Sequence, residues 1–210
     1  MITFLRQLFR LDKKQPVSRR KRAMFSRHSR LEKLEDRCLL AATFDVATSV
    51  SGLGDLAAIE VADFNNDGND DVAAVNFGQN LVNVVLGDGS GGFISTSGYS
   101  SGGNLPVTLA VNDFNNDLNL DIAVANVVND TIHVLVGDGA GGFSAGPTIS
   151  SMGQNPFKIN SADFNLDGNS DLIVANEASD SVVLFLGNGG LGFSGTSYSS
   201  SGTRPLGLGV

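Results

Sequence analysis

Three acidic nonapeptides, spaced fifty residues apart, are the segments of this 210-residue chain whose side chains could bind an ion. They read DFNNDGNDD at 63–71, DFNNDLNLD at 113–121 and DFNLDGNSD at 163–171. Every copy has Asp, Asn, Asp and Asp at loop positions 1, 3, 5 and 9. In a tightly turned loop this spacing aims the side chains at one centre, and oxygen ligands suit a hard cation such as Ca²⁺. The sequence therefore predicts about three calcium sites.

The predicted ligands of each site are the four side-chain oxygens and the backbone carbonyl of the Asn at position 7. They are Asp63, Asn65, Asp67, Asn69 and Asp71; Asp113, Asn115, Asp117, Asn119 and Asp121; and Asp163, Asn165, Asp167, Asn169 and Asp171. Three carboxylates within nine residues repel one another, and a divalent ion relieves that repulsion. The alternative interpretation of each loop is a set of Asx turns that caps the strand ends.

The three sites are not expected to be equal. Gly68 and Gly168 occupy loop position 6, where the chain has to turn sharply, whereas Leu118 occupies it in the second loop. A left-handed conformation at this position costs a non-glycine residue about 1 kcal/mol or more. The middle site is therefore predicted to bind calcium weakest.

An EF-hand is excluded by the residues that follow each loop. The EF-hand requires a bidentate Glu at position 12 and flanking helices. Position 12 is Ala74, Val124 or Val174, and each lies in an apolar run that is typical of a strand.

Charge divides the chain into a basic leader, residues 1–42, and an acidic body, residues 43–210. Twelve of the 14 Lys and Arg residues lie in 1–37 beside four acids, so that segment carries +8 and the remainder −16. The acidic body disfavours nucleic acid and anionic membranes as partners and favours divalent cations. The single Cys excludes an intrachain disulfide, and apolar runs are too short for a transmembrane helix.

The acidic body reads as three fifty-residue repeats of four short strands each. Apolar residues 56–62 lead into the first acidic loop, and the runs 72–76, 81–87 and a Phe-headed strand from Phe93 follow it. The intervening GDGSGGF at 87–93 has the spacing of a nucleotide-binding glycine loop, but it recurs in each repeat and no helix follows it. A hairpin turn that needs positive φ explains these glycines. The period predicts an all-β fold of propeller blades.

These repeats resemble the FG-GAP/VCBS repeat of integrin α-chains and of exported bacterial proteins. The resemblance rests on A-D-F-N-x-D-G-x-x-D followed by V-A-N and by the glycine turn, and it spans all three repeats. It implies four-stranded antiparallel blades with calcium held between the first two strands of each blade. Because propellers close with about four to eight blades, three blades predict a partial or open propeller with exposed strand edges that favour self-association.

The leader allows three interpretations: a disordered basic tail with short amphipathic helical pieces, a nucleic-acid or nuclear-import patch, and an export segment. The segment RLEKLEDRCLLAA at 30–42 resembles the LEPR-XLL segment of large exported bacterial repeat proteins, although Asp36 stands where that family has Pro. The matching residues are Leu31, Glu32, Leu34, Glu35, Arg37, Leu39 and Leu40. This resemblance implies an extracellular or cell-surface location in a bacterium.

No enzyme is predicted from this chain. Its histidines are His28, in the leader, and His133, which is expected to face solvent on a strand. No Ser/His/Asp or Cys/His arrangement stands out, and the three repeats are nearly interchangeable. The sequence predicts a calcium-binding, integrin-α-like interaction or adhesion module for other proteins or surface glycans, and not for nucleic acid. The alternative is the non-catalytic part of an exported propeller enzyme whose active residues lie outside this chain.

Overall fold

The computed structural model describes residue 49, residues 51–202 and residues 204–208. They belong to the second of two compact units, Val46–Val210. The basic leader and its predicted export segment lie outside the described residues.

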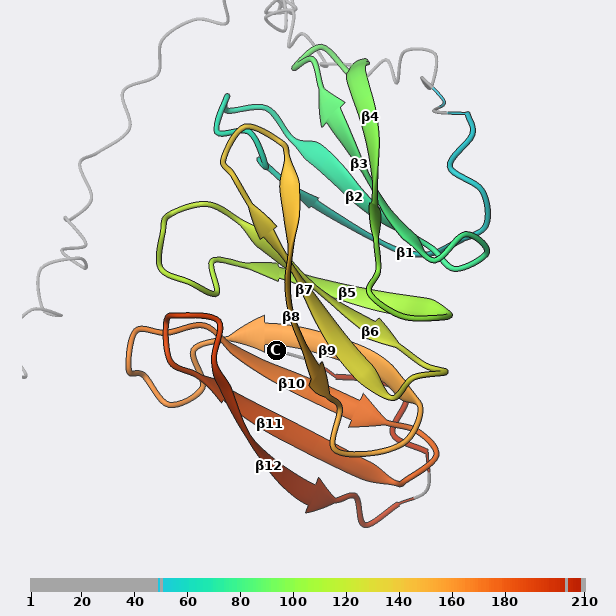
Figure 1. Cartoon of the computed structure of the whole chain (residues 1–210), viewed down its shortest axis with the longest axis vertical. Coiled ribbons are helices and arrows are strands. Elements are labelled where there is room, and N and C mark those ends of the chain that lie inside the picture. Colours follow the sequence, from blue (N-terminus) through green and yellow to red (C-terminus); the bar gives the residue numbers. More distant parts are fainter. Residues whose placement is uncertain (1–48, 50, 203, 209–210) are drawn as a thin grey trace, which may run out of the picture. The chain divides into compact units, whose positions relative to one another are not determined.

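The described residues form twelve strands in three four-stranded antiparallel sheets (Figure 1). The first sheet contains β1 (Leu56–Ala62), β2 (Asp71–Asn76), β3 (Leu81–Gly87) and β4 (Phe93–Ser100). The second contains β5 (Pro106–Asn112), β6 (Asp121–Asn126), β7 (Thr131–Gly137) and β8 (Phe143–Ser150). The third contains β9 (Pro156–Ala162), β10 (Asp171–Asn176), β11 (Ser181–Gly187) and β12 (Phe193–Ser199).

Each sheet is a meander in which every strand pairs with the next one along the chain. The register repeats from sheet to sheet: Val72 lies opposite Val85, Ile122 opposite Leu135, and Leu172 opposite Phe185. The second strand of each sheet is apolar on both faces because a sheet or loop covers each of them. The all-β prediction and the predicted blade of four strands are confirmed.

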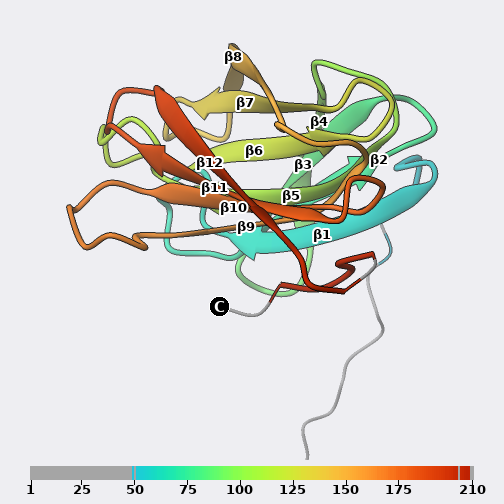
Figure 2. The ribbon, with the colours of Figure 1, turned by 90° about the horizontal axis from the view of Figure 1, so that it is seen from below.

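The three sheets follow one another in chain order, as the colours of Figure 1 show. Figure 2 shows the same strands from below. The first strands of the three sheets are neighbours, since β1 contacts β5 and β5 contacts β9. This is the arrangement of propeller blades whose innermost strands surround an axis. The three sheets form an open set of blades, as predicted.

The hydrophobic core lies between the sheets and consists of two clusters. One joins Phe64, Val75 and Val84 of the first blade to Leu109 and Ile122 of the second. The other joins the second blade to the third through residues that include Phe114, Ile132, Ile159, Leu172 and Phe185. Each blade therefore depends on its neighbour to remove its apolar face from water.

Among the described residues no helix is long and apolar enough to cross a membrane.

Substitution at the same repeat position should lower the free energy of unfolding by very different amounts in different blades. Ile159 is fully buried against the second blade, whereas its counterpart Ile59 is 59% exposed. We expect Ile159→Ala to lower the free energy of unfolding by about 2–5 kcal/mol, because it leaves a cavity, and Ile59→Ala to lower it by less than about 1 kcal/mol. Urea unfolding at low protein concentration measures both, and equal losses would contradict a core that lies between the blades.

Candidate metal-binding loops

The three acidic loops connect the first strand of each blade to the second, since they join β1 to β2, β5 to β6 and β9 to β10. Phe at loop position 2 anchors the loop, and its side chain is buried in the first two blades. Loop positions 3 to 8, which follow it, are half-exposed or exposed. Each loop thus presents its oxygen atoms to solvent from a fixed base.

Within the first loop, the side chains at positions 1, 3 and 5 converge on the backbone of the turn. Asp63 Oδ1 and Asn65 Oδ1 both accept from the backbone N–H of Asp67, each at 3.1 Å. Asp63 Oδ2 accepts from Gly68 N at 2.8 Å, and Asp67 Oδ1 accepts from Asn69 N at 2.8 Å. Asn65 Nδ2 donates to Asp67 Oδ2 at 2.9 Å. The loop is therefore a series of Asx turns that brings three side chains together.

The second and third loops repeat this geometry. The backbone N–H of Asp117 donates to Asp113 Oδ1 at 3.2 Å, and that of Asp167 donates to Asp163 Oδ1 at 3.2 Å. The position 3 amide again donates to the position 5 carboxylate, at 2.9 Å for Asn115 and 2.8 Å for Asn165. The three loops therefore share these hydrogen bonds, residue for residue.

The ninth position of the loop has a different environment from the first, third and fifth. Asp71 is fully buried, its Oδ2 accepts from Phe64 N at 2.9 Å, and its Oδ1 accepts from Gly87 N at 2.8 Å. Asp121 and Asp171 make the same two bonds in their blades. Each carboxylate fastens the start of the loop to the end of the third strand. Sequence reasoning placed it among the ligands and did not predict this clamp.

Two kinds of environment act on the acidity of these carboxyl groups. The pKa of Asp67 and that of Asp167 lie below the ordinary value, chiefly because the backbone N–H of Asn69 or Asn169 bonds the carboxylate. Burial, assisted by the neighbouring charges of Asp117 and Asp113, raises the pKa of Asp121 to about 6, against the hydrogen bonds from Gly137 and Phe114.

The donor chemistry of the loops fits calcium, although the carboxylates do not form a preformed cluster. All the side-chain donors are oxygen atoms, as Ca²⁺ requires. Across residues 49, 51–202 and 204–208, however, no three His, Cys, Asp or Glu side chains are gathered as a group that could hold a metal ion. The carboxylates face backbone N–H groups, so an ion has to replace some of these hydrogen bonds.

Backbone strain distinguishes the loops, and one part of it was predicted. Leu118 adopts φ 71° at position 6, where Gly68 and Gly168 adopt 85° and 87°, which confirms that this position is left-handed. The structure adds a second strained position. Leu166 adopts φ 60° at loop position 4, which is left-handed in every copy and is occupied by Asn elsewhere. Both leucine side chains are 88% exposed.

An interaction between neighbouring loops was not predicted. Asn116 Nδ2 donates to Asn169 Oδ1 of the next loop at 2.9 Å, and Asn66 Nδ2 lies 3.4 Å from Asn119 Oδ1. Position 4 of one loop thus bonds position 7 of the following loop. The recurrence of Asn at position 7 was the available signal, but it was interpreted only through its backbone carbonyl.

The prediction that His133 faces solvent is wrong. Its side chain is 5% exposed, and its Nδ1 shares a hydrogen bond of 2.7 Å with Thr148 Oγ1. Burial lowers the pKa of this imidazole. The linker between blades covers the residue, since a Cβ at Gly102 would lie 2.3 Å from the imidazole ring. Strand alternation alone did not reveal that cover.

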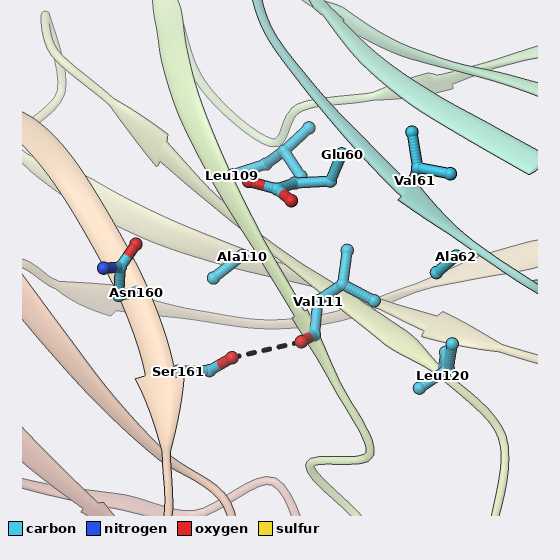
Figure 3. A pocket seen from close by; sticks show the side chains of 9 residues that line it. All are labelled: Glu60, Val61, Ala62, Leu109, Ala110, Val111, Leu120, Asn160 and Ser161. Carbon is cyan, nitrogen blue, oxygen red and sulfur yellow. Dashed lines mark hydrogen bonds between the residues drawn. The ribbon is translucent and has the colours of Figure 1, made fainter. Parts of the chain in front are cut away.

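The first strands of the three blades also line a cavity of about 410 Å³ (Figure 3). Glu60, Ala110 and Asn160 contribute to it from β1, β5 and β9, and the Ser161 hydroxyl donates to the carbonyl of Val111 at 3.1 Å. The lining combines the Glu60 carboxylate and the Asn160 amide with small and apolar side chains.

Comparison with known proteins assigns the repeats. An FG-GAP-like repeat matches residues 63–124 and again residues 113–174, which together cover more than half of the chain. The chain belongs to the FG-GAP-like repeat family. In this FG-GAP-like protein each match begins at the first residue of an acidic loop and ends within the second strand of the next blade. The resemblance stated from the sequence is confirmed for the FG-GAP repeat.

Two solved structures match part of this chain at low sequence identity. BBS1N in complex with ARL6DN, soaked with lead, is 14% identical over 73% of this chain and 44% of that chain, with a TM-score of 0.49. An Agrocybe aegerita lectin that recognises non-reducing terminal N-acetylglucosamine is 16% identical over 69% of this chain and 38% of its own, with a TM-score of 0.47. The FG-GAP-like chain thus spans less than half of either structure. No curated protein matches it.

The clamp at the ninth loop position should contribute strongly to stability. We expect Asp71→Asn to lower the free energy of unfolding by about 2–3 kcal/mol in a calcium-free buffer, because the amide N–H₂ would face a backbone N–H donor inside the protein. Asp70→Asn, at an exposed position in the same loop, should change it by less than about 0.5 kcal/mol. Chemical denaturation of both variants in EGTA makes this comparison, and similar losses would disprove the clamp.

Relief of the left-handed leucines should stabilise the protein. We expect Leu118→Gly and Leu166→Asn to raise the free energy of unfolding by about 0.5–1 kcal/mol each, since Gly and Asn tolerate positive φ. Leu206→Asn is the control, because Leu206 is also exposed but has no positive φ. The measurement is thermal unfolding in EGTA. An equal gain from the control would mean that loss of exposed apolar surface, and not backbone strain, causes the effect.

Proposed function

We propose that this chain is a calcium-binding interaction module of an exported protein, with one structural Ca²⁺ in each acidic loop. The observation that carries this proposal is the threefold repetition of one hydrogen-bonded loop with side-chain oxygens at positions 1, 3, 5 and 9. Asx turns alone need Asn or Asp at single positions, and they do not call for three carboxylates in nine residues. A divalent ion accounts for that charge.

The residues that would hold the ion are the side chains at positions 1, 3 and 5 and the carbonyl at position 7. In the first loop they are Asp63, Asn65, Asp67 and Asn69. Calcium binding exchanges the Asn65–Asp67 hydrogen bond and some N–H contacts of Asp63 for ion contacts. Asp71 can contribute one further oxygen lone pair while it continues to clamp Phe64 and Gly87. Its main role in this proposal is to hold the loop in place.

The proposed ion has a structural role because of where the loops lie and how much charge they carry. Each loop connects the first two strands of a blade, and residues 38–210 carry a net charge of −16. At a free calcium concentration about 100-fold above Kd, one site adds roughly 2.7 kcal/mol to stability. Calcium also neutralises part of the repulsion within the acidic body.

The interaction role follows from the fold and not from a catalytic site. The blades present loops at the ends of the strands, and the described set leaves one sheet face uncovered on its first blade and one on its third. Such surfaces suit other proteins, surface glycans or further blades. The export proposal depends on the leader's resemblance to LEPR-XLL segments, and a bacterial cell-surface location would supply the calcium that the loops use.

Calcium titration tests this proposal. We expect calorimetry on the full chain to detect about three sites and the melting temperature to rise with calcium and fall with EGTA. Asp63→Ala should remove one site. Asp70→Asn should remove none, since it deletes the same charge from the same loop without deleting a predicted ligand.

Unequal affinities are part of the same expectation. The middle site should bind weakest, and Leu118→Gly should tighten it, because the bound ion holds position 6 in the left-handed conformation. An unchanged melting temperature in calcium would overturn the calcium proposal. Equal affinities of all three sites, with no gain from Leu118→Gly, would overturn the ranking while leaving calcium binding intact.

A further inference from the structure

The first and third blades each have one face that the described chain does not cover with another blade. On the first blade this is the β1–β4 face directed away from the second blade, here called the socket face. Ile59 is 59% exposed there, whereas its counterparts Leu109 and Ile159 are 1% and 0% exposed because a preceding blade covers them. The socket face therefore displays Ile59 at a position that the second and third blades bury.

A cavity of about 480 Å³ lies on the socket face. Its lining includes Asn69, Gly89, Gly91 and Phe93. At the corresponding positions of the second blade this space is filled by residues of the first blade. A Cβ at Gly141 would meet Leu86 of the first blade at 2.8 Å, whereas a Cβ at Gly91 would meet nothing within 4 Å.

The two internal junctions show what fills such a cavity. Phe64 packs edge-on against Phe143 of the next blade at 5.6 Å, and Phe114 packs against Phe193 at 5.9 Å. The backbone carbonyl of each of these two loop residues accepts a hydrogen bond from a backbone N–H in the glycine turn of the next blade. Gly141 N donates to Phe64 O at 3.1 Å, and Leu191 N donates to Phe114 O at 3.3 Å. Both junctions therefore involve the Phe at position 2 of an acidic loop.

In the third blade the equivalent residue is Phe164, and no further blade of the described chain covers it. Phe164 is 38% exposed, whereas Phe64 and Phe114 are 2% and 1% exposed. The face that carries Phe164, here called the plug face, is the counterpart of the faces that fill the internal cavities. Phe93 on the socket face is also 38% exposed and has the position of Phe143 and Phe193.

We propose that the plug face of one copy of this chain docks on the socket face of a second copy, head to tail. Phe164 packs against the partner's Phe93, and the carbonyl of Phe164 accepts the N–H of the partner's Gly91. The occupant is a second copy because the interface continues one that the chain already forms twice within itself. Two copies joined at both junctions contain six blades, which lies within the range of closed propellers. The proposal deepens the interaction role proposed above and does not depend on calcium.

Two features make this docking weaker than an internal junction. Leu166 occupies loop position 4, where Asn66 and Asn116 donate a hydrogen bond to position 7 of the next loop. Leucine has no donor, so the docked pair lacks this bond to Asn69 of the second copy. Residues 204–208 also run beside β9, where the partner's β1 has to lie, since Asn160 Nδ2 donates to Leu208 O at 3.3 Å. Within the described chain this is the one hydrogen bond made by residues 205–208, so the partner strand can displace them.

Sedimentation velocity of the full chain over a range of concentrations tests the proposal. We expect a reversible equilibrium between one and two copies, in calcium and in EGTA alike. Phe93→Ser and Phe164→Ser should each raise the dimer Kd at least about tenfold, because each removes an aromatic pair and its buried area. Val128→Ser is the matched control, since Val128 is an exposed apolar residue of the middle blade, and it should leave the Kd unchanged.

Two further variants should tighten the dimer. Leu166→Asn restores the inter-loop hydrogen bond and should lower the Kd by about two- to tenfold. Deletion of residues 205–210 removes the competing segment and should lower it further. Circular dichroism checks that every variant remains folded.

The outcomes separate this proposal from the calcium proposal. A wild-type chain and a Leu166→Asn variant that both stay monomeric overturn the docking, even if they bind calcium. Association that Phe93→Ser and Phe164→Ser do not weaken more than Val128→Ser also overturns it. If the chain binds no calcium but forms a dimer that Phe93→Ser and Phe164→Ser weaken, the docking is supported and the calcium proposal fails.

Discussion

The structure depends on the burial of apolar surface between sheets and not within them. A four-stranded sheet is one layer thick, so it has no interior of its own, and its middle strands need a cover on both faces. In this chain the cover is the next blade, and the two hydrophobic clusters lie at the two internal junctions. Stability, the order of the blades and the exposure of both end faces follow from this single requirement.

The acidic loops contribute to the packing between blades, in addition to presenting oxygen atoms that could bind an ion. Their Phe at position 2 enters the space between blades, and their Asp at position 9 fastens the loop to the end of the third strand through two backbone N–H groups. Positions 1, 3 and 5 remain on the exposed side of the same turn. One nonapeptide therefore combines a packing anchor, a buried clamp and a group of oxygen donors, which explains why the three copies are so similar.

Much of the fold was predictable because its signals are local and repeated. The bounds of β1 and β3 and the hairpin glycines such as Gly89 agree with the sequence interpretation, since apolar runs and positive-φ turns are encoded within a few residues. His133 and Asp71 were misjudged in part because their environments come from distant segments. A linker covers the first, and the end of β3 supplies a partner to the second. Leu166 shows the same limit, because its strain depends on the backbone conformation at position 4.

The amino-acid sequence by itself was sufficient to predict the FG-GAP-like family, the four-stranded unit and the fifty-residue period. It also identified the oxygen-bearing side chains of the acidic loops. These properties depend on the order of residue types along the chain, and they are repeated three times. Folding in three dimensions established which of these oxygens are already engaged by backbone N–H groups, and that Ile59 and Phe164 are exposed where their counterparts are buried. The physical reason is that hydrogen-bond partners and burial are supplied by neighbouring blades, and the same residue type therefore has a different environment at the end of the set than inside it.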